Sequence, residues 1–302
     1  IHLPLTSAPF YLEGWLPKCG RLGFYASAKT GKSFTAVQLA RCIGAGEPFL
    51  GISTQQGRVL YLQFELGDKV LQDRLISTGK SYDNVYLGTT FSMKLDHPVG
   101  QEQLISALMV IKPDVLILDP WYKLMGGDEN EAQDTEKVTD FVDEVVIEAF
   151  GCSVVIFLHA GKDVSKGGRG SSVLEGWVDS YVEMKKVNKV GEPLRVKIMP
   201  KLLRHSALPP EPIEAVLDKF EFVLAAEQEK EESIKDDLRD MFLSLGNGEI
   251  LSVHKILTCD EPPTTNRSTI YKHLDSLITE GIITKVGRGE YALAGYSPQD
   301  KT

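Results

Sequence analysis

The stretch YASAKTGKSFTAVQLARCIGAG (Tyr25–Gly46) decides the fold of this 302-residue chain. It matches the phosphate-binding pattern G-x-x-x-x-G-K-[ST] at Gly31, Lys32 and Ser33, with Ala26 in place of the first glycine. The residues before it, RLGFY, predict a short buried strand, and those after it predict a helix closed by glycines. A strand, a Gly-Lys-Ser loop and a helix in this order are what the motif requires.

The chemistry of such a loop assigns a role to each residue. Backbone N–H groups surround a phosphate at the start of a helix, where the helix dipole favours negative charge. Gly31 lets the backbone approach the phosphate, Lys32 supplies charge to the β- and γ-phosphates of ATP, and Ser33 offers a hydroxyl to Mg²⁺. Alanine is tolerable at Ala26 if its φ stays negative. The residues expected to contact the nucleotide are Ala28, Lys29, Thr30, Gly31, Lys32, Ser33 and Phe34.

Composition and charge narrow the classes of function. With 302 residues, 42% of them hydrophobic, the chain can bury a large core in one domain, or in a large and a small one. No apolar run approaches membrane-spanning length and the first residues do not resemble a signal peptide, so we expect a cytoplasmic protein with no membrane partner. A formal net charge of −9 argues against bulk electrostatic coating of nucleic acid, so any DNA contact has to be local.

Strand-like and helix-like segments alternate from residue 21 to about residue 157. Apolar runs such as GRVLYLQF (Gly57–Phe64), PDVLILD (Pro113–Asp119) and CSVVIFL (Cys152–Leu158) predict strands buried on both faces. This alternation indicates an α/β fold with a doubly wound, mostly parallel sheet. Segments that alternate at period two follow and predict antiparallel strands added at one edge: 177–187, 192–202 and 219–225.

The character of the sequence changes near residue 225. AAEQEKEESIKDD (Ala225–Asp237) is charged and lacks a strong apolar face, as in a linker or the solvated start of a helix. Three helical segments and two short strands follow, a pattern typical of a winged helix. The expected organisation is an ATPase domain over residues 1–225, an acidic linker over 226–232 and a winged-helix domain over 233–302.

Three polar side chains lie where strands of the predicted sheet end, and ligands collect at this edge of open α/β sheets. Asp119 is a candidate partner of Mg²⁺, although alone it could be a turn or N-cap residue. Glu65 can orient a water for attack on the γ-phosphate, or simply lie beside a helix N-cap. His159 can sense the γ-phosphate or pack. The Gly- and Ser-rich loop beyond it carries Lys166 and Arg169 and is either a solvent loop or a binding loop.

The order of GKSFTAVQLARCIGAG, GRVLYLQFE, DVLILDPWYKLMGGDENE, LHAGKD and KIMPKLLRH resembles that in RecA-like ATPases of the RepA type, hexameric replicative helicases related to DnaB and RadA. The similarity spans about Phe10 to Leu224. It implies a RecA-like P-loop NTPase fold and a ring of subunits. It also implies these roles: phosphate and Mg²⁺ binding by Lys32 and Ser33, catalysis by Glu65, Walker B acid at Asp119 and sensor at His159.

In that family a Lys/Arg pair reaches the neighbouring subunit's nucleotide, and Lys201 and Arg204 occupy the matching place. They are spaced K-L-L-R where the family has K-x-R, which leaves open which of them acts as the finger. Ala26 is the second departure from the family pattern.

Two functions stay open. The first is a hexameric motor that moves on single-stranded DNA, with Lys166 and Arg169 facing the channel. The second is an ATP-gated regulator or loader in replication, recombination or transposition that assembles on DNA or a protein partner without unwinding. A small-molecule kinase is disfavoured because no acceptor-binding lid is evident.

The winged-helix segment bears on the same choice. Arg267, Lys272 and Arg288 are the residues expected to contact DNA there, with duplex DNA as the candidate ligand. Thr265 to Glu290 holds four basic and three acidic residues, however, which is a weak footprint for phosphate binding. Contact with a protein or packing within the ring is an equal alternative.

Overall fold

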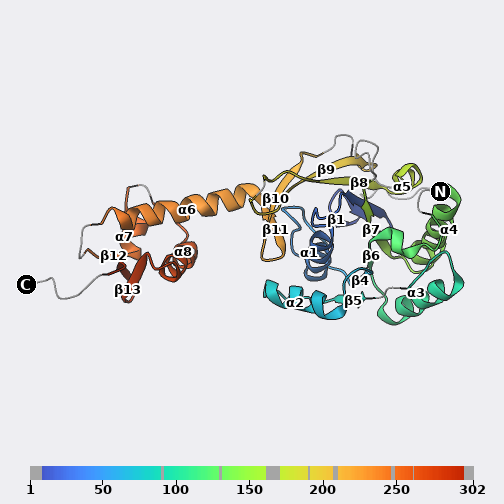
Figure 1. The fold of residues 1–302 in the computed structure, drawn as a ribbon, viewed down its shortest axis with the longest axis horizontal. Coiled ribbons are helices and arrows are strands. Elements are labelled where there is room, and N and C mark those ends of the chain that lie inside the picture. The colour runs from blue at the N-terminus through green and yellow to red at the C-terminus, as the bar shows by residue number, and fades with distance from the viewer. Residues whose placement is uncertain are drawn as a thin grey trace, which may run out of the picture. The chain divides into compact units, whose positions relative to one another are not determined.

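The computed structural model describes residues 9–89, 92–128, 131–160, 171–189, 191–206, 210–245, 249–260 and 262–295. The chain divides into two compact units, Ile1–Ala225 and Ala226–Thr302 (Figure 1). No helix within these described ranges is both long enough and apolar enough to cross a membrane.

The first unit is built on one sheet, which comprises nine strands among the residues that the structure describes. Their order across the sheet is β11 (Glu221–Leu224), β10 (Ile213–Asp218), β9 (Arg195–Leu203), β8 (Ser180–Lys186), β3 (Arg21–Ala26), β7 (Ser153–His159), β6 (Val115–Asp119), β4 (Val59–Gln63) and β5 (Val85–Thr89). The six strands from β8 to β5 run parallel, and β9 to β11 add antiparallel neighbours at one edge. The predicted α/β class with a mostly parallel sheet is confirmed.

Two details differ from the prediction. The segment expected to give the first antiparallel strand forms β8, which pairs parallel to β3 and antiparallel only to β9. Strand β10 was not predicted, although it forms the hairpin that carries β11. Period-two alternation marks a strand face but carries no information on strand direction, which explains the first error.

Helices cover both faces of the sheet (Figure 1). On one face α1 (Lys32–Ala45) packs with the β1–β2 hairpin (Phe10–Leu12 and Leu16–Pro17) on inward residues such as Tyr61. The neighbouring residues Leu60 and Leu62 point to the other face, because side chains alternate along a strand. That face is covered by α3 (Pro98–Ile111), α4 (Ala132–Phe141), the π-helical segment η2 (Val142–Ala149) and α5 (Ser171–Trp177). The remaining elements are α2 (Asp68–Thr78) and the 3₁₀ turn η1 (Trp121–Leu124).

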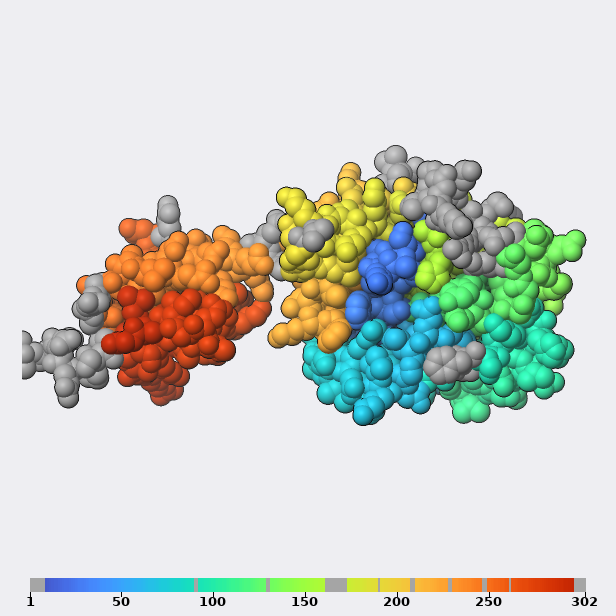
Figure 2. Space-filling model, in the orientation of Figure 1, coloured from blue at the N-terminus to red at the C-terminus, as the bar shows by residue number. Residues whose placement is uncertain are grey.

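The second unit contains three helices and a small sheet. The helices are α6 (Ala225–Leu243), α7 (Val253–Thr258) and α8 (Arg267–Thr279), and residues 226–232 form the first turns of α6. Among the described residues the sheet has the order β12 (Leu251–Ser252), β14 (Glu290–Leu293) and β13 (Ile283–Gly287). Its core joins α6, α7, α8 and the sheet through Leu238, Ile256, Leu274 and Tyr291. Figure 2 shows the segment from α8 to β14, in deep orange to red, lying against α6, in orange.

Candidate nucleotide-binding site

The predicted phosphate-binding loop joins β3 to α1 at the carboxyl edge of the parallel strands. Gly31 has a φ of 94°, in the left-handed region that favours glycine. A Cβ at this position would come within 2.7 Å of the Phe222 ring, so packing also requires glycine. Ala26 ends β3 in extended backbone and its carbonyl accepts the N–H of Ala160 at 2.9 Å. The first position of the motif needs no positive φ here, and alanine fits it.

Lys32 folds back onto its own loop. Its Nζ donates to the carbonyl oxygens of Ala26 and Ser27 at 3.0 and 3.1 Å and lies 3.3 Å from Nδ1 of His159. Burial of the side chain, which is 7% exposed, lowers the pKa of Lys32, and the negative charges of Asp119 and Glu65 oppose that shift. The ammonium is therefore desolvated and close to both candidate carboxylates.

Asp119 is almost fully buried at the end of β6. Its Oδ2 accepts the hydroxyl of Tyr61 at 3.0 Å, and Ser33 also hydrogen-bonds to this carboxylate. Burial raises the pKa of Asp119, while the hydrogen bonds from Ser33 and Tyr61 and the charge of Lys32 act to lower it. A buried carboxylate in contact with a serine hydroxyl is an oxygen donor set that fits Mg²⁺.

Glu65 follows β4 and is held at both its side chain and its backbone. Tyr122 donates its hydroxyl to Oε1 of Glu65 at 2.9 Å, and Nε2 of His159 lies 3.8 Å from the same oxygen. Oε1 of the buried Gln63 accepts the N–H groups of Glu65 and Leu66 at 3.1 and 2.7 Å. Lys32, His159, Glu65 and Tyr122 thus form a continuous series of contacts at the edge of the sheet.

The structure therefore brings together five predicted residues from four segments: Lys32, Ser33, Glu65, Asp119 and His159. The sequence matches the AAA domain family over residues 3–165, more than half of the chain. The chain belongs to the AAA domain family. Its first unit has the fold of RecA-like P-loop NTPases.

A solved structure supports the fold of this AAA domain protein. The KaiC-like protein of the hyperthermophilic archaeon Pyrococcus horikoshii aligns over 71% of this chain and 93% of its own, with a TM-score of 0.52 and 14% sequence identity. At that identity the likeness concerns the fold alone. No curated protein matches the sequence.

The other predicted loop residues line the same turn of the AAA domain. Ala28 and Lys29 are exposed, and Lys29 has a left-handed φ of 61°. Thr30 is buried and its hydroxyl donates to the carbonyl of Ser27 at 2.8 Å, which fixes the turn from inside. Phe34 lies in the first turn of α1 and faces a pocket.

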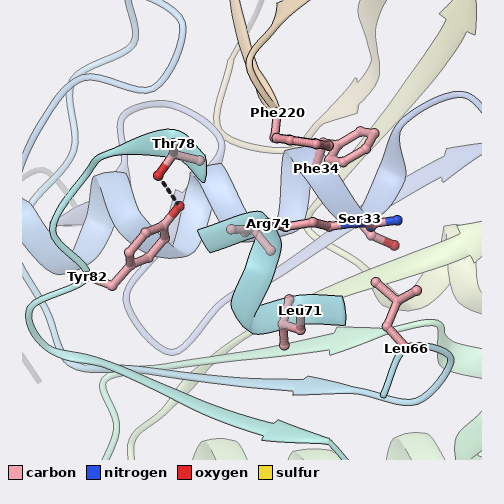
Figure 3. A pocket seen from close by; sticks show the side chains of 9 residues that line it. Ser33, Phe34, Leu66, Leu71, Arg74, Thr78, Tyr82 and Phe220 are labelled. Carbon is pink, nitrogen blue, oxygen red and sulfur yellow. Dashed lines mark hydrogen bonds between the residues drawn. The ribbon is translucent and has the colours of Figure 1, made fainter. Parts of the chain in front are cut away.

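This pocket opens beside Ser33, between the first turns of α1, the helix α2 and the tip of the β10–β11 hairpin (Figure 3). The Phe34 and Phe220 rings lie 5.7 Å apart, and the guanidinium of Arg74 lies 4.9 Å from the centre of Phe34. The rest of its wall is mainly apolar: Val37, Leu66, Leu71, Thr78 and Tyr82. The pocket has a volume of about 10 Å³, room for one water molecule, because the two rings and the guanidinium pack against one another.

Lys201 and Arg204 lie apart from this cluster, on β9 and directly after it. Lys201 pairs with Glu183 at 2.9 Å. Arg204 donates to the carbonyl of Gly176 and lies 3.9 Å from a carboxylate oxygen of Asp179. Both side chains remain nearly half exposed, at 45% and 47%, and are accessible from outside the subunit.

The residues predicted to bind DNA have different surroundings. Lys166 and Arg169 lie outside the described residues. Arg267 is exposed at the start of α8 with its guanidinium 5.8 Å from the Tyr271 ring centre, and Arg288 is exposed between β13 and β14. Lys272 pairs with Glu231 of α6 at 2.7 Å, so an acidic side chain already accompanies one of the three basic residues.

Four side chains of the site were missed in the sequence: Tyr61, Gln63, Arg74 and Tyr122. Gln63 carried a signal, because a polar residue in the otherwise apolar run VLYLQ calls for a buried hydrogen-bonding role. Tyr61 lies two residues before Gln63 and therefore on the same face of β4, because side chains alternate along a strand. No sequence pattern indicated Tyr122 or Arg74, because only the tertiary packing of η1 and α2 places these side chains beside the site.

Proposed function

We propose that this AAA domain protein hydrolyses ATP at the site described and couples hydrolysis to movement on DNA, as a RepA-like helicase or translocase. One observation carries the ATPase proposal. His159 lies 3.3 Å from Lys32 and 3.8 Å from Glu65, while Ser33 and Asp119 form a hydrogen-bonded pair beside them. The first group suits a γ-phosphate and its attacking water, and the second suits a divalent cation.

Each residue then has a defined task. The ammonium of Lys32 exchanges its loop carbonyl partners for phosphate oxygens. The negative charge of the phosphate then compensates for the desolvation of the buried ammonium. Ser33 and Asp119 would hold Mg²⁺, which supplies charge neutralisation between the β- and γ-phosphates. Glu65 orients the attacking water and takes its proton, and His159 lies between Lys32 and Glu65 where it contacts the γ-phosphate.

The pocket beside Ser33 has a volume of about 10 Å³, room for one water molecule, so it does not hold the base of a nucleotide in this structure. A nucleotide whose phosphates lie on Gly31 to Ser33 could stack its base on Phe34, Arg74 or Phe220 only after these side chains, which pack on one another, move apart.

Assembly into a ring, with six subunits as in the resembled family, is part of the proposal. Lys201 and Arg204 are partly exposed cations separate from their own subunit's Lys32–Glu65 cluster. In a ring one of them reaches the neighbour's γ-phosphate and stabilises the charge that develops there. Each must first leave its partner, Glu183 or Asp179, whose carboxylate is largely buried, so the free energy gained at the neighbour's phosphate has to offset the loss of that pair.

An ATP-gated regulator or loader is the second candidate, and the charge distribution favours it. The chain carries a net charge of −9, and Lys272 on the helix expected to read DNA is paired with Glu231. Both features reduce attraction to phosphate. In this case the second unit binds duplex DNA weakly or binds a protein partner.

A strand-displacement assay on forked DNA separates the two candidates. A helicase separates the strands only with ATP and Mg²⁺, and Lys32→Ala abolishes the reaction because the phosphate charge is no longer met. Turnover per subunit rises with protein concentration if the site is completed in a ring. ATP hydrolysis without strand separation at any concentration would contradict the helicase and favour the regulator.

A further inference from the structure

Tyr122 stands out among the side chains that the proposed hydrolysis does not use. It lies on η1, three residues beyond Asp119, and its hydroxyl donates to Oε1 of Glu65 at 2.9 Å. Its ring meets the His159 ring edge-on, with centroids 5.2 Å apart and an interplanar angle of 60°. A single side chain therefore contacts both the proposed water-orienting carboxylate and the proposed sensor.

The position of Tyr122 is fixed by its neighbours in the chain. Trp121 and Leu124, on the same turn, are 1% and 0% exposed. The Trp121 ring packs against the Trp177 ring, with centroids 5.7 Å apart. The buried side chains of Trp121 and Leu124 fix η1 to the hydrophobic core on one face of the sheet, while Tyr122 is only half-buried. A donor on an anchored turn keeps its direction whether or not a ligand is bound.

Glu65 needs such a donor because little else restrains its side chain. The carboxylate is 39% exposed, and the terminal torsion of glutamate is broad. Gln63 fixes the backbone at Glu65 through the N–H groups of Glu65 and Leu66, but it does not reach the carboxylate. A hydrogen bond to Oε1 leaves Oε2 available for the attacking water in a defined direction.

We propose that Tyr122 is a positioning residue for Glu65: its hydroxyl holds Oε1 so that the other carboxylate oxygen faces the water that attacks the γ-phosphate. This inference rests on the proposed hydrolysis of ATP through Glu65. Tyr122 acts through Glu65 and makes no contact with the nucleotide, so it raises kcat and leaves nucleotide binding unchanged.

The test is a double-mutant cycle on the full chain. Tyr122→Phe removes one oxygen atom and keeps the ring against His159, and it is measured in the wild-type and Glu65→Gln backgrounds. Tyr86→Phe on β5, an exposed tyrosine outside the site, is the matched control. The readouts are phosphate release at saturating ATP, KM, affinity for a fluorescent ATP analogue, and the thermal midpoint.

Tyr122→Phe is expected to lower kcat by about ten-fold, with analogue affinity within about two-fold and the thermal midpoint unchanged. In the Glu65→Gln background the same substitution has no further effect, because the group it positions is gone. Tyr86→Phe leaves every readout at the wild-type value.

Two results overturn the inference alone: wild-type kcat in Tyr122→Phe, or an equal loss in both backgrounds, since the hydroxyl would then not act through Glu65. A wild-type chain that shows no Lys32-dependent ATP hydrolysis overturns the proposed function and this inference together.

Discussion

Burial sets the electrostatics of the two residues at the centre of the site. It lowers the pKa of Lys32 and raises that of Asp119, so each charge is disfavoured in the protein by itself. Phosphate oxygens beside Lys32 and a divalent cation beside Asp119 would reverse both shifts. Opposed pKa shifts of two neighbouring groups are typical of ligand-binding sites, because burying a charge costs free energy until a bound ligand compensates it.

The two small residues of the phosphate-binding loop are expected to respond differently to substitution. Gly31→Ala places a Cβ at a φ of 94° and 2.7 Å from the Phe222 ring. It should lower the free energy of unfolding by about 2–4 kcal/mol and abolish nucleotide binding. Ala26→Gly, the matched control, should cost only about 0.5–1 kcal/mol and retain binding. Urea denaturation and binding of an ATP analogue measure both; equal effects of the two changes would refute the assignment.

At the scale of elements, the β10–β11 hairpin is joined to α1 by buried polar contacts. The Gln38 amide donates to the Phe222 carbonyl at 2.7 Å and accepts the Phe222 N–H at 2.8 Å. Next to it, Arg41 pairs with Glu221 at 2.5 Å. The same Phe222 ring lies against Gly31. The hairpin is therefore joined to α1 and packs against the phosphate-binding loop at Gly31.

Gln38→Leu tests how much the hydrogen bonds between Gln38 and the Phe222 backbone contribute to the free energy of unfolding. The change keeps the volume but leaves the N–H and C=O of Phe222 without partners in a buried place, which should cost about 2–4 kcal/mol of unfolding free energy. Gln103→Leu on the exposed face of α3 should change stability by less than about 0.5 kcal/mol. Chemical denaturation gives both values, and a neutral Gln38→Leu would show that the hairpin is not held this way.

Prediction from the sequence succeeded for elements whose pattern is local. The apolar runs of β4, β6 and β7 mark strands buried on both faces, and the Gly-Lys-Ser turn marks the start of α1. It failed where long-range pairing decides. β8 lies parallel to β3 because the chain crosses over through α5, and the alternation of its side chains does not record that. Tyr122 is near Glu65 for the same reason: two adjacent strands end together.

At the scale of the whole molecule, the chain passes from β11 at Leu224 directly into α6 at Ala225, the helix that enters the second unit. The hairpin that packs on Gly31 is therefore continuous in sequence with that unit. The acidic balance of the chain, with 33 basic and 42 acidic residues, makes DNA contact dependent on local basic groups and so on salt. ATP hydrolysis at the Lys32–Glu65 cluster is the claim on which every other proposal depends.

The most direct test compares ATP binding and hydrolysis in Glu65→Gln and Lys32→Ala. Glu65→Gln keeps the shape of the site and removes only the group that activates water, so nucleotide affinity should stay within about three-fold while turnover falls by about 100-fold or more. Lys32→Ala should lose affinity as well, because the phosphate loses its buried charge partner. Wild-type turnover in Glu65→Gln, measured as phosphate release by the full chain with ATP and Mg²⁺, would contradict the account.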